Sequence, residues 1–80
     1  MDTQNQQKAL MKLVMTKMPF GKYKGRLIAD IPENYLVWMH GQGFPKGEIG
    51  MLLSTAYEIR LNGLDEILDN LKKIKFQSMK

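Results

Sequence analysis

The segment Met18–Gly25 reads Met-Pro-Phe-Gly-Lys-Tyr-Lys-Gly. It limits the possible folds because the helical spacing of apolar residues stops at this segment and a different apolar spacing follows it. Before it, residues 5–16 place a row of apolar side chains on one helical face, which predicts a short amphipathic helix. Pro19 pushes the residue before it out of the α-helical region. The first helix must therefore end at this segment.

The pattern after Pro19 predicts a β-hairpin. Phe20 and the apolar run Leu27–Ala29 are separated by a turn at residues 21–25, which contains two glycines. Two short apolar segments around such a turn are typical of paired strands. A two-stranded hairpin is only marginally stable alone, so we expect helices to cover one of its faces.

The remaining sequence predicts three more helices. Asp30, Pro32 and Glu33 have the spacing of a capping box with proline in the first turn, and the helix that starts there should end at Gly41 or Gly43. Two further helical periods follow, at residues 46–61 and from residue 64 to about residue 75. We expect these last two helices to pack against each other as a helical hairpin. The predicted fold class is α+β, mostly helical, with a short two-stranded β-hairpin packed against about four helices.

Length and composition indicate one folded domain over residues 1–80. The chain is 44% hydrophobic and 25% charged, which is a globular balance. We place the core of the motif at residues 18–65 and expect residues 1–5 and 77–80 to be flexible. With no cysteine, no secretory signal and no run of about 20 apolar residues, the sequence predicts a cytoplasmic protein that is neither secreted nor membrane-bound.

Charge is segregated along the chain. Residues 8–26 contain six lysines and arginines and no acid, whereas residues 27–71 contain seven acids against Lys46 and Arg60, a balance of −5. Such asymmetry favours a polyanionic partner. The alternative, which the sequence leaves equally open, is a basic face that only keeps the protein soluble.

The basic segment also contains an aromatic residue, which is typical of nucleic-acid binding. Glycines let the backbone turn sharply, the cations Lys17, Lys22, Lys24 and Arg26 could contact phosphates, and Tyr23 could stack on a base or pack at the contact. Phosphate contacts do not read sequence, so binding should be mostly sequence-tolerant. The predicted function is a non-catalytic nucleic-acid-binding accessory domain, with DNA preferred to RNA.

The other aromatic residues favour structural roles. We interpret Phe20 and Trp38 as core residues, and Tyr35, three residues before Trp38, as packed against the hairpin. Tyr23 is isolated among lysines and glycines, and for this residue the binding role is favoured.

No arrangement of residues indicates catalysis, a metal or a cofactor. His40 is the one histidine and is better explained as a cation at a helix C-terminus, and neither Ser54 nor Ser78 has the setting of a nucleophile elbow. The carboxylates are dispersed or lie in first turns. The glycine-rich string lacks the spacing of a phosphate-binding loop. We therefore expect no enzymatic activity.

The string Met18–Trp38 resembles a small bacterial family of unknown function that is labelled as quorum-sensing-regulated virulence factors. It is also similar to the C-terminal segment of exodeoxyribonuclease X-like proteins. Both resemblances rest on Phe-Gly-Lys-Tyr-Lys-Gly, then Ile-Pro, then Tyr-Leu-x-Trp, and extend to about residue 65. The second implies an accessory module beside a DNA-processing domain, with Lys22 and Lys24 inside the shared motif and the catalytic acids in a separate domain.

A second function remains open. The chain could be a protein-interaction adaptor or small regulatory subunit that docks on a larger DNA-processing enzyme through the hairpin or a methionine-bearing helix face. The sequence does not indicate an oligomeric state.

Overall fold

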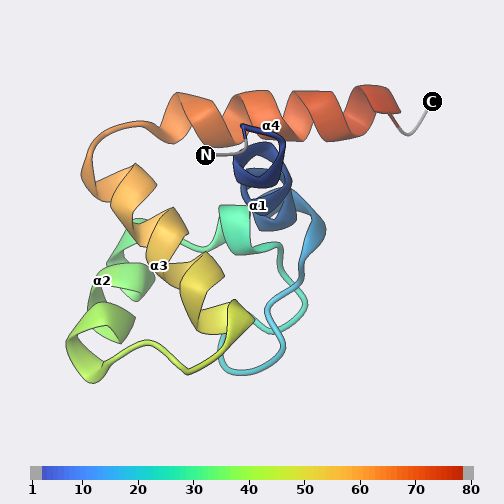
Figure 1. Cartoon of the computed structure of the whole chain (residues 1–80). Coiled ribbons are helices and arrows are strands. Elements are labelled where there is room, and N and C mark those ends of the chain that lie inside the picture. The colour runs from blue at the N-terminus through green and yellow to red at the C-terminus, as the bar shows by residue number, and fades with distance from the viewer. Residues whose placement is uncertain (1–2, 79–80) are drawn as a thin grey trace.

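The computed structural model describes residues 3–78 and arranges them as a small helical globule (Figure 1). The predicted flexibility of residues 1, 2, 79 and 80 concerns positions outside the described residues, and residues 3–5 and 77–78 belong to the first and last helices. The elements in chain order are α1 (Thr3–Met15), the 3-10 helix η1 (Ile28–Asp30), α2 (Glu33–Gln42), α3 (Glu48–Leu61) and α4 (Asp65–Ser78).

The predicted β-hairpin is wrong, and with it the α+β fold class. Among residues 3–78 there is no strand, and the only remnant of the expected pairing is an isolated antiparallel bridge between Lys17 and Leu27. The run expected as a strand instead forms η1, where the Asp30 amide donates to the Leu27 carbonyl at 2.9 Å. Ile28 and Ala29 are consecutive and both fully buried, whereas a hairpin strand covered on one face only would turn one of the two side chains to the uncovered face.

The four predicted helices are confirmed, but their pairing differs from the expected one. In Figure 1, α4 runs across the top of the molecule next to α1, while α2 packs against α3 below. The expected hairpin of α3 and α4 is wrong because α4 contacts mainly α1. The turn between them has positive φ at Gly63, +70°, and the Leu64 amide bonds to the Ile59 carbonyl, so the chain changes direction sharply.

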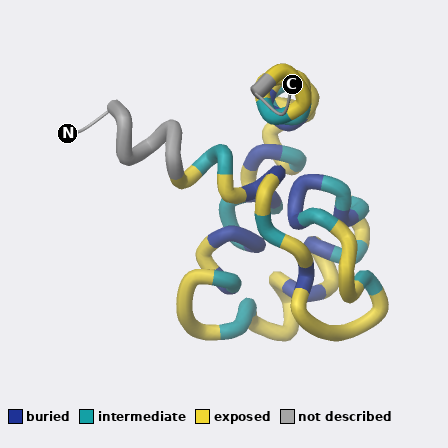
Figure 2. The backbone as a smooth tube through the Cα atoms, turned by 90° about the vertical axis from the view of Figure 1, so that its right-hand side faces the viewer, coloured by how far each residue is buried: buried dark blue, intermediate teal, exposed yellow. Residues whose placement is uncertain are grey.

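The core is aliphatic and receives side chains from every element. Buried residues lie along the inner faces of the tube in Figure 2, and no aromatic side chain is fully buried among residues 9–77. This follows the usual preference of aliphatic side chains for full burial. The buried residues are Leu13, Val14, Met18, Ile28, Ala29, Ile31, Leu36, Met39, Leu52, Leu53, Ala56, Ile59, Leu68 and Leu71.

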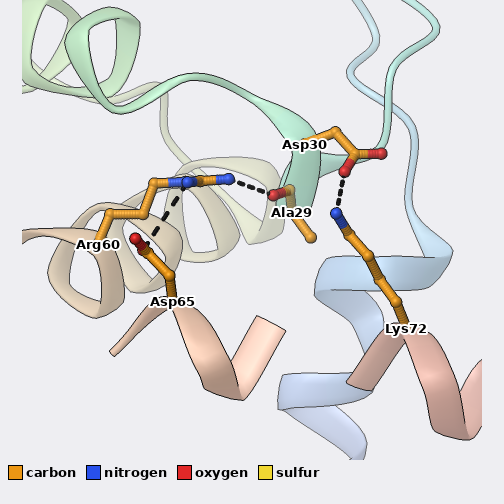
Figure 3. Close-up of polar contacts among 5 residues, drawn as sticks. All are labelled: Ala29, Asp30, Arg60, Asp65 and Lys72. Atoms are coloured by element: carbon orange, nitrogen blue, oxygen red, sulfur yellow. Dashed lines mark hydrogen bonds and ion pairs between the residues drawn. The ribbon is translucent and has the colours of Figure 1, made fainter. Parts of the chain in front are cut away.

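The start of α2 differs from the predicted capping box. Pro32 is the N-cap residue and makes no side-chain cap bond. The carboxylate of Asp30 instead pairs with Lys72 of α4, 42 residues away (Figure 3). The helix end is confirmed: Gly43 closes α2 with a φ of +93°.

Arg60 of α3 connects η1 to the start of α4. One guanidinium nitrogen donates to the Ala29 carbonyl at 2.6 Å, and another lies 3.8 Å from the Asp65 carboxylate (Figure 3). Together with the pair between Lys72 and Asp30, this contact fixes η1 to both C-terminal helices.

The connection between α2 and α3 depends on a buried glycine. A Cβ atom at Gly50 would lie 1.6 Å from the carbonyl oxygen of Pro45, far inside van der Waals contact. Helix α3 therefore rests directly on the main chain of the preceding loop, and only glycine permits that approach.

We predict that Gly50→Ala destabilises the fold by about 3 kcal/mol or more. Enlarging a packed core position typically costs about 1–3 kcal/mol, and here the added carbon meets main-chain atoms that cannot rotate away. The measurement is the urea unfolding midpoint followed by circular dichroism. Gly41→Ala is the matched control, because a Cβ there meets open space in α2 and should leave stability equal or raise it by up to about 1 kcal/mol. Equal midpoints for the two variants would contradict the prediction.

Candidate nucleic-acid interface

The residues predicted to bind nucleic acid lie on one loop, residues 16–27, which we call the basic loop. It is the light-blue to cyan segment at the lower right of Figure 1. Its two arms are joined by main-chain bonds: the Met18 amide donates to the Arg26 carbonyl at 2.7 Å, and the Gly25 amide donates to the Met18 carbonyl at 2.8 Å. The loop is thus a closed, ordered turn without strands.

Met18 attaches this loop to the core. Its side chain is 1% exposed, while its neighbours Lys17 and Pro19 are exposed. The main chain of the same residue makes both cross-loop bonds. Met18 therefore contributes both to the closure of the loop and to its attachment to the core.

The four predicted phosphate ligands are exposed on this loop. Within residues 3–78, none of Lys17, Lys22, Lys24 and Arg26 forms an ion pair with an acid. Three cations of the helices do pair with acids: Lys12 with Glu48, Arg60 with Asp65 and Lys72 with Asp30.

Tyr23, at the tip of the basic loop, is half-buried. Its ring meets Tyr35 of α2 edge to face, with centroids 4.8 Å apart and planes at 79°, a favoured geometry for aromatic pairs. The Lys22 ammonium lies 5.5 Å from the Tyr23 ring centroid. The tyrosine packs against the globule and supports the lysine beside it, while part of its ring stays accessible.

Trp38 and Phe20 lie at the surface, and the expectation that both are core residues is wrong. Trp38 is 55% exposed and Phe20 41% exposed. Leu36 and Met39 form the buried face of α2, and a residue two positions after Leu36 projects to the other side of a helix. The spacing of Leu36, Trp38 and Met39 in the sequence was therefore sufficient to predict that Trp38 lies outside the core.

Tyr35 connects the exposed tryptophan to the basic loop. Its ring centroid lies 5.5 Å from that of Trp38. A Cβ atom at Gly21, where φ is +79°, would lie 3.1 Å from the Tyr35 hydroxyl oxygen, so the loop backbone passes close to the end of this side chain. Tyr35 was expected to pack against a hairpin and contacts a loop instead, and three aromatic rings in contact lead from this loop to the surface of α2.

His40 belongs to a separate aromatic cluster. Its ring is stacked on Tyr57 with centroids 4.5 Å apart, and Phe44 contacts both rings. Within the part of the chain that the structure describes, no three histidine, aspartate or glutamate side chains gather in a position to hold a metal ion. None of the helices in residues 3–78 combines the length and apolar character needed to cross a bilayer.

Comparison with known proteins places the chain in a family. The family model described as "Putative quorum-sensing-regulated virulence factor" matches residues 6–71. The chain belongs to this family. It is also 42% identical over 65 residues to the uncharacterized protein YpeB of Escherichia coli K12 and to that of Escherichia coli O157:H7, covering 80% of this chain and 90% of each relative. No solved structure matches the chain.

We predict that Met18→Ala is much more destabilising than Trp38→Ala. Truncating a fully buried methionine costs about 2–5 kcal/mol, whereas a mostly exposed tryptophan that loses one aromatic pair should cost less than about 1.5 kcal/mol. Urea unfolding of the two variants under identical conditions measures the difference. A larger loss for Trp38→Ala would show that its ring supports the fold.

Proposed function

We propose that this protein is a non-catalytic accessory domain that binds nucleic acid, DNA in preference to RNA, through the basic loop. The supporting observation is the exposure of Lys17, Lys22, Lys24 and Arg26 on one ordered loop without acidic partners among residues 3–78. Cations that no acid in the described part of the chain compensates are available to phosphates.

The strength of this interaction should depend on salt. Each phosphate contact releases condensed counterions, so the logarithm of the binding constant falls with log salt by about 0.7 per contact on single strands and about 0.9 on duplex DNA. Because phosphates recur at every nucleotide, contacts of this kind tolerate sequence changes.

A place beside DNA-processing machinery agrees with this proposal. The segment that resembles the C-terminal part of exodeoxyribonuclease X-like proteins includes Lys22 and Lys24. A domain of that kind would raise the local concentration of DNA for a separate catalytic domain. We propose a cytoplasmic location, where DNA is accessible and a chain without cysteine needs no oxidising compartment.

We predict that Lys22→Ala/Lys24→Ala weakens binding to oligonucleotides. Loss of two phosphate contacts should lower the steepness of the salt dependence by about 1.4 on single strands and about 1.8 on duplex. The measurement is fluorescence anisotropy of labelled single- and double-stranded oligonucleotides at several salt concentrations.

The matched control is Lys46→Ala/Lys73→Ala, which removes the same charge from exposed positions outside the basic loop. It should bind nearly as the wild type does. Equal losses for the two double variants would mean that only net charge matters. The proposal fails if the wild type does not bind at low salt, or if Lys22→Ala/Lys24→Ala binds as the wild type does.

An adaptor that docks on a DNA-processing enzyme is the second candidate function. An apolar groove of about 340 Å³ between α1 and α4 favours it, lined by Leu10, Met11, Leu71 and Ile74. Ile74 is 52% exposed, so part of this lining is accessible to another protein. The groove includes Met11, whose unbranched side chain adapts to different partners.

For the adaptor, we predict that Ile74→Gln abolishes capture of the enzyme partner from nuclease-treated extract and leaves oligonucleotide binding unchanged. Glutamine keeps the helix propensity of α4 and removes apolar surface from the groove. A partner that survives nuclease and high salt but is lost with Ile74→Gln supports this function. If nuclease alone removes every partner, the adaptor function is excluded.

A further inference from the structure

We infer that Trp38 and Phe20 extend the basic loop into a base-stacking surface, and that its ligand is single-stranded nucleic acid. This inference rests on the proposed function and adds a ligand class and two residues to it. Two large exposed aromatic side chains beside uncompensated cations carry it.

The exposure of these rings is unfavourable for a protein of this size. Burying a large apolar side chain contributes about 1.5–3 kcal/mol to folding, and an 80-residue chain has a small core. Trp38 nevertheless leaves 55% of its surface in solvent, and Phe20 leaves 41%. Other large hydrophobic side chains, such as Met51 and Leu61, are exposed as well, so the inference rests on the position of these two rings relative to the basic loop and not on exposure alone.

The tryptophan is held in a defined place next to the cations. Its ring contacts Tyr35 at a centroid distance of 5.5 Å, and Tyr35 contacts Tyr23 of the basic loop at 4.8 Å. Phe20 directly precedes Gly21, whose backbone lies close to the Tyr35 hydroxyl. Tyr35 therefore contacts both Trp38 and the loop that carries the proposed phosphate ligands.

The charges around the rings complement a polyanion. The basic loop carries four exposed cations, and its Tyr23 is the first ring of this row. Glu33 is the acid of α2, and it lies five residues before Trp38, which places it about 140° around the helix from the tryptophan. A strand that follows the lysines can thus reach Trp38 without passing over that carboxylate.

Stacking distinguishes single strands from duplex DNA. In a duplex the faces of the bases are covered by their neighbours, whereas a single strand can turn a base onto an aromatic ring. Loss of one stacking side chain typically weakens binding by about 1–3 kcal/mol, which is about a 5- to 140-fold change in Kd.

The test uses the full chain and oligodeoxythymidylate, with a mixed-sequence duplex carrying the same number of phosphates. Trp38 is the one tryptophan of the chain, so its intrinsic fluorescence reports directly on its surroundings. We expect the single strand to quench this fluorescence saturably and the duplex to leave it nearly unchanged.

Variants separate stacking from charge. Trp38→Ala should weaken single-strand binding about 5- to 140-fold at every salt concentration with an unchanged salt slope, whereas Lys22→Ala/Lys24→Ala lowers the slope. Trp38→Phe keeps an aromatic face and should recover most of the affinity. Val37→Ala, at an exposed neighbour in α2, should bind as the wild type does.

The outcomes distinguish this inference from the proposed function. If Lys22→Ala/Lys24→Ala weakens binding but Trp38→Ala does not, or if single strand and duplex bind alike, the stacking surface is refuted and the proposed function stands. If no oligonucleotide binds at low salt, both fail. If Trp38→Ala loses a nuclease-resistant protein partner and no affinity for oligonucleotides, these rings are a protein-docking site and the inference is overturned.

Discussion

The burial of Met18 anchors the first arm of the basic loop, which carries the candidate phosphate ligands. The basic loop gathers four cations, and two like charges 4 Å apart in water repel by about 1 kcal/mol, less when salt screens them. Burying one methionine side chain contributes about 1.5–3 kcal/mol. This single anchor therefore outweighs any one repulsive pair, and the main chain of the same residue also closes the loop through its bonds to Gly25 and Arg26.

The far end of the loop is fixed just as firmly. Ile28 and Ala29 are fully buried in η1, Arg60 bonds to the Ala29 carbonyl, and Lys72 pairs with Asp30. Between these two ends, Tyr23 rests on Tyr35. The backbone that carries the exposed cations is thus ordered before any ligand binds, so binding costs it little conformational entropy. The adaptable parts are the long side chains of the lysines.

Local patterns in the sequence predicted the helices well, but they did not predict the structure of the segment between α1 and α2 or the long-range contact of Asp30. The period of the apolar residues located all four helices, and the glycine at position 43 located the end of α2. The hairpin failed because an apolar run of three residues fits a buried 3-10 turn as well as a strand. The capping box failed because Asp30 has a partner 42 residues away, which local spacing does not contain. Charge and composition were enough to name the cations and Tyr23 of the candidate site. The surface positions of Trp38 and Phe20 were not predicted, because they depend on which helix faces pack into the aliphatic core.

The isolated bridge between Lys17 and Leu27 has a consequence for the protein's behaviour at high concentration. A longer hairpin in this position would offer rows of unpaired amides and carbonyls to neighbouring molecules, next to exposed aromatic rings. One bridge, which includes a lysine and is followed at once by a helical turn, offers no such row. The loop can therefore display a phenylalanine and four cations on a small domain without presenting an edge on which other copies could align and aggregate.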